Sequence, residues 1–351
     1  MEPTTHRTMA SLQRTVFVAS KLQLMREEEP KAPQNQAMLL LLPDRVLELG
    51  LGCVGVHECQ MNKWSEGFRK EVFHWHHGSS PTVLSRMWFD LQQGGHLSEK
   101  QNTHAGFKRH CIAHFFLWTH PKNAGLMATR FNTCRKHCCG KMLWDWIGKI
   151  MALMPAVIKW DDSLGDPDKS PFVGTTDCTD CGMWEKSARH HFNTDKSCCS
   201  KKKNRAGLKH ETVLDTTQSK CLSVVGPCKA KEHDMNAFRE ETKAKMLEMK
   251  QRSGDKMSIG DSICKPGRKA CHRDEVGMFS VPNSLDAGTV KNFKSRSRCR
   301  HESFNGRLKH FGFLQQDCRG VDVEKHGTAF RAICTIVQCQ MDLGSPLFPV
   351  N

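Results

Sequence analysis

The chain has 351 residues, and its 52 Lys and Arg against 37 Asp and Glu give a formal net charge of +15 with His neutral. Its 38% hydrophobic and 25% charged residues are typical of a globular protein and exclude the collagen-like and wholly disordered classes. The longest apolar run, 37–42, is far shorter than the roughly 18 residues of a membrane span. The first thirty residues have no apolar stretch typical of a secretory signal. We therefore expect a soluble protein of about two domains, with no membrane as a partner.

The cysteine, histidine and tyrosine counts are unusual. The sequence holds 18 Cys and 19 His but no Tyr, where ordinary usage gives on the order of ten. Codons for Cys and His each lie one transition from a Tyr codon, so we expect many of these residues to stand at positions suited to tyrosine. Because a chain of this length can bury its own core, the cysteines favour reduced thiols in the cytosol or nucleus over a disulfide scaffold.

Residues 1–60 are expected to form a poorly ordered or partly helical leader, and 61–160 a helical region. Apolar side chains at 64, 68, 72 and 73 recur at helical spacing up to a turn at 74–78. Ser79 and Ser80 can then cap a helix that has Pro81 in its first turn. This pattern predicts a helix, a turn and a second helix.

A second helix-turn-helix pattern follows. It comprises a helix over 107–118, a short helix over 124–130, a break at Asn132 and a long helix from Thr133. Arg135 and Lys136 lie near the start of that last helix, where a recognition helix contacts base edges in the major groove. The pattern allows DNA binding by this region, and a helical bundle with basic ends is the ordinary alternative.

From about residue 168 the pattern changes to strands. Strands are predicted over 172–177, 207–216, 220–228, 256–263 and 276–281, with helices over 232–249, 286–311 and 324–341. A three-strand meander followed by alternating helices and strands predicts an α+β domain, with a mixed sheet flanked by helices, over 168–345. This is also the element order of RNase H-like nucleases.

Three acidic residues are placed to act together in such a domain. Asp177 ends the first predicted strand, Asp261 ends the fourth, and Glu302 lies on a helix. Carboxylates suit Mg²⁺ or Mn²⁺, and two such ions can stabilise both oxygens of an in-line phosphodiester displacement. The alternative is that Glu302 is a surface residue paired with Arg298 one turn away.

Several ordered strings carry a family resemblance: GTTDCTDC at 174–181, EHDMNAFR at 232–239, GDSICKPGRK at 260–269 and RHESFNGRLKHF at 300–311. With HHGSSPTVLSRMWFDLQ and FFLWTHPKNAGLMATRFN upstream, the region from about 62 to 348 resembles eukaryotic DDE transposases of the PIF/Harbinger-like group. The resemblance implies that Asp177, Asp261 and Glu302 are the catalytic metal ligands. Asp234 matches a further recurrent acidic position of the family.

By this resemblance the protein is expected to be a nuclear DNA transposase and endonuclease. It would use two Mg²⁺ or Mn²⁺ ions on double-stranded DNA, at transposon ends and at target sites. A Myb-like accessory DNA-binding protein and a second copy of the chain are further partners. Cys178 stands where a glycine usually follows the first acid, and Ile263 and Cys264 replace a small residue and a tyrosine. The alternative is therefore a decayed or domesticated relative that binds DNA without turnover.

Two basic segments are candidate DNA contacts. Residues 291–310 hold seven Lys or Arg against one acid, and 196–209 hold six against none. Such segments can follow a phosphate backbone, although a solvated surface is the usual alternative. The DNA-contacting side chains expected here are Lys201, Lys202, Arg296, Arg298, Arg300, Arg307 and Lys309. The run 201–205 also fits a nuclear import signal.

Clusters of Cys and His allow a third interpretation, a zinc-dependent structural or adaptor protein. One cluster combines Cys178 and Cys181 with His190, His191, Cys198 and Cys199, and the other comprises Cys134, His137, Cys138 and Cys139. Both have spacing compatible with zinc ligands. If these residues stand in for tyrosines, the clusters are accidental.

Overall fold

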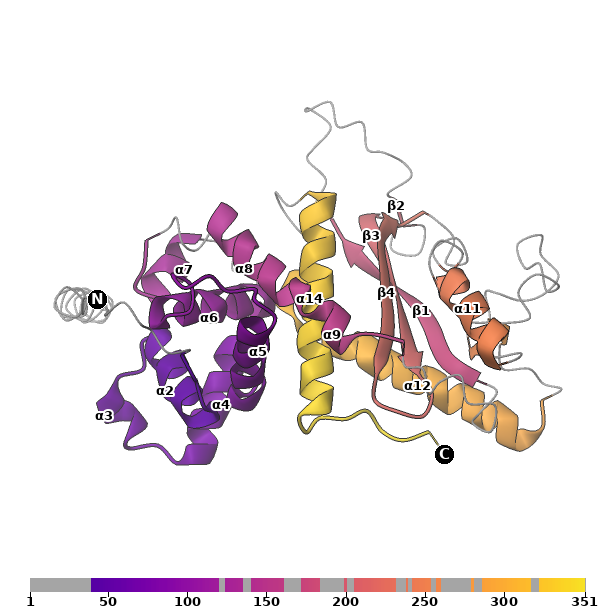
Figure 1. Cartoon of the computed structure of the whole chain (residues 1–351), viewed down its shortest axis with the longest axis horizontal. Helices are drawn as coiled ribbons and strands as arrows, with labels where there is room; N and C mark the ends of the chain where they lie inside the picture. The colour runs from indigo at the N-terminus through magenta and orange to yellow at the C-terminus, as the bar shows by residue number, and fades with distance from the viewer. Residues whose placement is uncertain are drawn as a thin grey trace, which may run out of the picture.

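The protein is a mixed α+β molecule in which a helical region and a sheet region lie on either side of one long helix (Figure 1). The computed structural model describes residues 39–119, 124–134, 140–160, 172–183, 199–200, 205–231, 238, 242–253, 257–259, 279–280, 286–316 and 322–350. Within these residues, no helix is both long enough and apolar enough to cross a bilayer.

The helical region comprises α2 Pro43–Cys53, α3 Glu58–Met61, α4 Glu66–His77, α5 Pro81–Gln93, α6 His104–Thr119, α7 Ala124–Arg130, α8 Lys141–Ala152 and α9 Met154–Val157. It therefore begins well before the expected boundary at residue 61. The helix α2 joins the core because Val46, Leu47 and Leu51 are buried against the other helices.

The first predicted helix pair is confirmed. Ser65 caps α4 by accepting a hydrogen bond from the Phe68 N–H, and Ser80 caps α5 by accepting one from the Val83 N–H. Gly78 ends α4 with φ 65°, in the left-handed region, and a Cβ there would overlap the Trp118 ring. Local sequence thus caps both helices, and contact with Trp118 further restricts the turn between them.

The second pair differs from the prediction. The helices α6 and α7 form as predicted. Asn132 interrupts the helical backbone after α7 with φ 43°, but the last helix begins at Lys141 rather than at Thr133. Gly140 precedes it with φ 70° and ψ −153°, a conformation outside the helical region. Arg135 and Lys136, expected near the start of this helix, lie outside the described residues.

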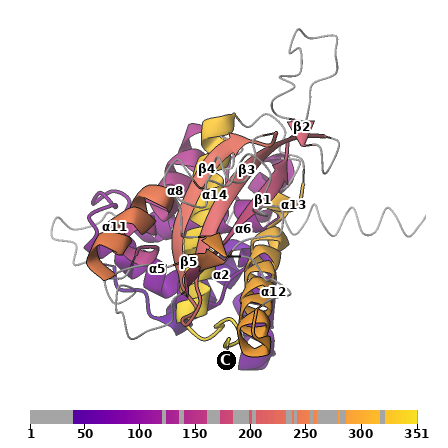
Figure 2. The ribbon, with the colours of Figure 1, turned by 90° about the vertical axis from the view of Figure 1, so that its right-hand side faces the viewer.

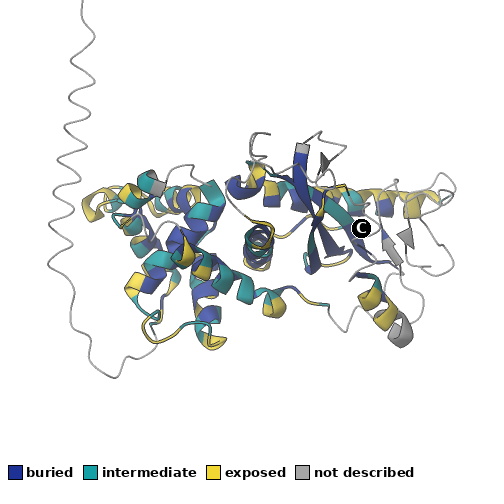
Figure 3. Cartoon of the chain, turned by 90° about the horizontal axis from the view of Figure 1, so that it is seen from above, coloured by how far each residue is buried: buried dark blue, intermediate teal, exposed yellow. Residues whose placement is uncertain are grey.

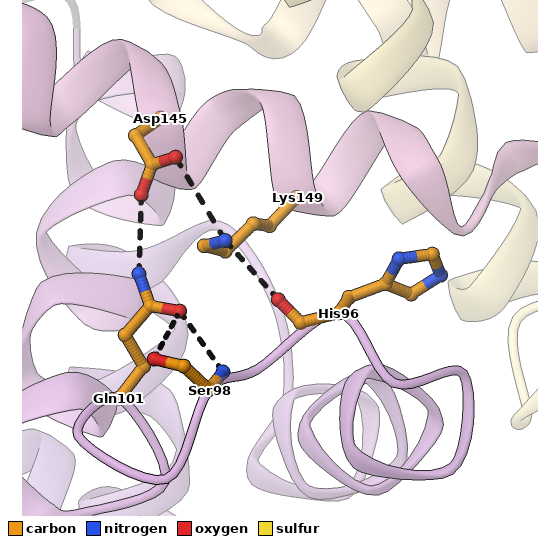
Figure 4. Close-up of polar contacts among 5 residues, drawn as sticks. All are labelled: His96, Ser98, Gln101, Asp145 and Lys149. Carbon is orange, nitrogen blue, oxygen red and sulfur yellow. Dashed lines mark hydrogen bonds and ion pairs between the residues drawn. The ribbon is translucent and has the colours of Figure 1, made fainter.

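A polar network fixes α8 against the loop that joins α5 to α6 (Figure 4). The Lys149 ammonium donates to the His96 carbonyl at 3.1 Å and lies 3.8 Å from the Asp145 carboxylate. The Gln101 amide donates to the same carboxylate and accepts bonds from the backbone and hydroxyl of Ser98. These contacts orient the solvent side of α8, while its apolar side packs in the core.

The sheet region comprises β1 Phe172–Gly182, β2 Cys199–Ser200, β3 Arg205–Asp215, β4 Cys221–Lys229, β5 Met257–Ile259 and β6 Phe279–Ser280, with α11 Lys243–Ser253, α12 Gly288–His310, α13 Gly312–Gln315 and α14 Val323–Asp342. In the described part of the chain, β4, β3 and β1 pair antiparallel, and β5 and β6 continue the sheet parallel to β1. The short strand β2 pairs with β3. The mixed sheet predicted from the element order is confirmed.

Helices cover both faces of this sheet. His210 and Thr212 of β3 point to one face, where they contact α14 and α12 respectively. Glu211 between them points to the other face and accepts a hydrogen bond from Thr242, next to α11. Figure 2 shows α12 and α11 at opposite sides of the sheet. The side of the sheet that faces α12 is where the candidate site lies.

One strand is longer than expected. The prediction ends the first strand at Asp177, whereas β1 continues to Gly182 because residues 178–182 stay paired with β3. Asp177 therefore lies within the strand, opposite Thr212, and not at its end.

The central helix α14 joins the two regions, and it is largely buried (Figure 3). Gln338 accepts a hydrogen bond from the backbone N–H of Cys221 in β4. Gln340, two positions on and therefore on another face, donates to the Gly78 carbonyl and the Ser79 hydroxyl between α4 and α5. The expected helical and β regions thus share one continuous apolar core.

Candidate active site between β1 and α12

One small pocket brings together two of the three acids singled out in the sequence. Asp177 from β1 and Glu302 from α12 both line it, with Ile259 at the end of β5. Its full lining is Thr175, Thr176, Asp177, Ile259, Arg298, His301 and Glu302. Elements far apart in sequence therefore converge at this point.

The third acid, Asp261, lies outside the described residues. The neighbouring strand nevertheless reaches the pocket, because Ile259, two residues before Asp261, pairs in parallel with Thr175.

His301 sets the position of α12 over the sheet. Its Nδ1 shares a hydrogen bond of 2.8 Å with the Thr175 hydroxyl of β1, and its Nε2 shares one of 2.9 Å with the Thr212 hydroxyl of β3. Burial lowers the pKa of His301 to about 3, opposed in part by a hydrogen bond to the Thr175 backbone. The imidazole is therefore neutral at ordinary pH, with one nitrogen donating and the other accepting.

Asn305, one turn further along α12, contacts the first acid directly. Its side-chain N–H₂ donates to Oδ2 of Asp177 at 2.8 Å, while Oδ1 of Asp177 accepts the Cys178 backbone N–H at 2.9 Å. Asn305 is only 2% exposed, whereas Glu302 on the same helix is exposed to solvent. The site thus has a fixed buried side and an open side.

The sequence does not single out His301, Thr175, Thr212 or Asn305 as parts of this site. A usable signal exists in the spacing. Thr175 and Asp177 share one face of a strand, and His301 and Asn305 lie four residues apart on one face of a helix. When the strand and the helix lie side by side, His301 faces Thr175 and Asn305 faces Asp177.

The basic residues predicted on α12 have different surroundings. Arg298 lines the pocket, and Lys309 is exposed. Arg300 is 2% exposed, and its guanidinium donates to the carbonyls of Asp215 and Thr216 in the β3–β4 turn. Arg300 thus fastens the helix to the sheet from within the fold.

Two other arginines of α12 contact the C-terminal segment. Arg296 donates to the Pro349 carbonyl at 3.2 Å, and Arg307 donates to the carbonyls of Ser345 and Pro346. Lys201, Lys202 and Asp234 lie outside the described residues.

The two acids of the pocket have the type of ligand atom that suits a hard cation. Asp177 and Glu302 offer carboxylate oxygens, the ligands that Mg²⁺ prefers. The pocket encloses about 10 Å³, close to the space of one water molecule. Among the described residues, no three His, Cys, Asp or Glu side chains are grouped to hold a metal ion.

The strand geometry counts against one zinc cluster. Cys178 and Cys181 are three residues apart in β1, and side chains alternate between the two faces of a strand. The two thiols therefore point to opposite faces and cannot share one tetrahedral ion without rearrangement. His190, His191, Cys198, His137, Cys138 and Cys139 lie outside the described residues.

Comparisons with known proteins add no family to this picture: neither a family model, nor a curated protein, nor a solved structure matches the chain.

Proposed function

We propose that the protein is a metal-dependent DNA endonuclease of the DDE type that acts as a transposase. The observation that carries this proposal is the convergence of Asp177 and Glu302 on one pocket, beside the strand that leads to Asp261. Acidic side chains that tertiary structure brings together from separate elements suit phosphodiester cleavage with bound cations.

The sheet topology supports an RNase H-like assignment for the region from residue 168. The antiparallel meander of β1, β3 and β4 is followed by a helix, and then by β5 and β6, which run parallel to β1. The long helix α12 then crosses β1 and supplies Glu302. This succession is the element order expected of such nucleases.

The residues of the site take distinct roles in this proposal. Asp177, Asp261 and Glu302 are the side chains that would hold two Mg²⁺ or Mn²⁺ ions. Bound there, such ions supply the positive charge that activates a water molecule or a 3′-hydroxyl and stabilises the leaving oxygen. Arg298, a guanidinium at the pocket, can pair with a DNA phosphate next to the scissile bond.

DNA binding in this proposal draws on the basic character of the chain. The net charge of +15 favours association with a polyanion, and the exposed Lys309 continues the basic surface of α12 beyond Arg298. Contacts of this kind are electrostatic, so binding weakens steeply as salt rises. The duplexes would be transposon ends and target sites in the nucleus, with a second copy of the chain or a Myb-like protein as partner.

The test is nicking of supercoiled plasmid by the purified full-length chain, with and without Mg²⁺ or Mn²⁺. We expect Asp177→Asn, Asp261→Ala and Glu302→Gln each to lower the nicking rate by about 100-fold or more, because each removes a charged ligand. Asp180→Asn is the matched control, since Asp180 lies on β1 but three positions from Asp177 and so on the other face. Unchanged nicking in all three variants would sink the assignment.

A second candidate function is DNA binding without turnover. It is favoured by the histidines in the helical core, because both ring nitrogens of His110 and His114 are buried without a hydrogen-bond partner among the described residues. Such groups are costly to bury and are expected in a sequence that has lost aromatic residues. Salt-sensitive duplex binding with no metal-dependent nicking would favour this candidate.

A further inference from the structure

We propose that Asn305 is a positioning residue of the candidate site: its side-chain amide holds the Asp177 carboxylate in the one orientation in which that carboxylate and Glu302 can share a cation. This inference rests on the proposed function, since it assigns a role within the same site. It adds a residue that does not ligate the cation but determines how well the ligands are arranged.

The hydrogen bonds of Asp177 define its orientation. Oδ2 accepts the Asn305 amide at 2.8 Å, and Oδ1 accepts the backbone N–H of Cys178 at 2.9 Å. Because each carboxylate oxygen has its own donor, rotation of the carboxyl group would break at least one bond. Each oxygen can accept more than one bond, so the carboxylate can still offer lone pairs to the pocket.

The amide reaches this position because α12 is docked in register with β1. The contacts between His301 and Thr175 and between Asn305 and Asp177 form two successive links between the helix and the strand. Two strand residues span about 6.6 Å and four helix residues about 6 Å, so the two links match in spacing. His301 is further held from β3 by Thr212, which lies opposite Asp177 in the sheet.

The amide is also oriented in one direction only. Asn305 is 2% exposed, and its Oδ1 atom is buried without a hydrogen-bond partner among the described residues. A structural asparagine normally satisfies both ends of its amide. Turning the amide over would set Oδ1 against the carboxylate of Asp177, two acceptors facing each other. The amide nitrogen of Asn305 is therefore directed at Asp177, and the amide oxygen is left without a hydrogen bond from the described residues.

Such a residue is expected to act through ligand geometry. Groups that orient metal ligands change metal affinity by about 10- to 100-fold when they are removed, although they do not touch the metal. Around Asp177 in the described structure, α12 supplies Arg298, His301 and Glu302, β5 supplies Ile259, and β3 supplies Thr212.

The experiment is a titration of the full-length protein with Mn²⁺, followed by electron paramagnetic resonance of the free and bound ion. Asn305→Ala should weaken Mn²⁺ binding about tenfold and broaden the spectrum of the bound ion. Asn305→Gln, which keeps the amide donor, should recover most of the affinity. Asn292→Ala, at an exposed position of α12, is the matched control and should leave both readouts unchanged.

The outcomes separate this inference from the proposed function. If the wild-type chain binds Mn²⁺ and Asn305→Ala binds it equally well with the same spectrum, the inference is overturned while the metal site stands. If the wild-type chain binds no Mn²⁺, the proposed function fails and the inference fails with it. Should Asn305→Ala not fold, as judged by thermal unfolding, Asn305→Leu fills a similar volume without a donor and takes its place.

Discussion

Buried histidines occur in both regions of the molecule, and His301 in the sheet region is held differently from His110 and His114 in the helical region. In the sheet region, His301 uses both ring nitrogens in hydrogen bonds to Thr175 and Thr212. In the helical region, the ring centroids of His110 and His114 of α6 lie 4.7 Å apart. Their ring nitrogens have no hydrogen-bond partner among the described residues. Burial lowers the pKa of His301 and of His110 to about 3. His301 thus connects separate elements through hydrogen bonds beside the candidate site, whereas His110 and His114 only pack as rings in the helical core.

The surroundings of His110 support the expectation drawn from the missing tyrosines. Its ring packs against those of Trp88, Phe107 and Trp146. An aromatic side chain suits this position, and imidazole adds two polar atoms that have no hydrogen-bond partner in the described part of the chain. The ring nitrogens of His110 are therefore a cost to the stability of the helical core.

The largest expected effect is a fall in the free energy of unfolding as the pH drops, which tests both regions at once. Burial lowers the pKa of His77, His110 and His301 to about 3, while an unfolded histidine titrates near 6.5. Below pH 6.5 the unfolded chain therefore takes up protons that the folded chain excludes. The stability from these groups is complete above that pH and falls as the pH drops.

The three histidines together should lower the free energy of unfolding by about 3 kcal/mol between pH 6.5 and 5.5. Urea unfolding at pH 7.5, 6.5 and 5.5 measures this change. His114 and His210, whose pKa values burial also lowers, should add to it. A free energy that stays constant down to pH 5.5 would contradict neutral buried histidines in both regions.

The next effect concerns the sheet region alone. His301→Leu should cost about 3 kcal/mol, because it leaves the buried hydroxyls of Thr175 and Thr212 without their shared partner. Urea unfolding at pH 7.5 tests this change. A loss below about 0.5 kcal/mol would show that the contact does not hold α12 to the sheet.

The corresponding change in the helical region should have the opposite sign. His110→Phe removes two unsatisfied nitrogens and keeps a ring among Trp88, Phe107 and Trp146, so we expect a gain of about 1 to 2 kcal/mol. The same substitution should also reduce the loss of stability at pH 5.5. Destabilisation by His110→Phe would mean that the histidine has a polar role in the core.

The smallest effect concerns the junction of the two regions. Gln340→Ala removes the hydrogen bonds from α14 to the Gly78 carbonyl and the Ser79 hydroxyl, and should cost about 1 kcal/mol. Gln315→Ala, at an exposed position of α13, is the control and should be neutral. Equal stabilities of the two variants would show that these bonds do not contribute to docking the regions.

Local sequence predicts much of the fold. Ser80 and Pro81 define the start of α5, and the apolar stripe of Phe304, Leu308 and Phe311 is buried as its spacing indicates. Periodicity also locates β3, β4 and α14 to within two residues at each end. These features depend on neighbours a few positions away, which is why they can be recognised in a single sequence.

Other features depend on contacts between distant residues. The strand β1 continues beyond Asp177 because β3 stays paired with residues 178–182. The residues near Asp177 in the sequence give no indication of that pairing. The docking of His301 onto Thr175 and Thr212, and the bond from Asn305 to Asp177, likewise join separate elements. Sequence motifs could therefore identify the candidate acids, but they could not identify the residues that position those acids.

The most direct measurement compares Mg²⁺-dependent plasmid nicking by the wild-type chain, Asp177→Asn and Asp180→Asn under identical conditions. If Asp177 and Glu302 form a metal-dependent nuclease site, the wild type and Asp180→Asn nick the plasmid at the same rate, and Asp177→Asn loses about 100-fold or more. Nicking that persists in Asp177→Asn, or that needs no divalent cation, would contradict the account.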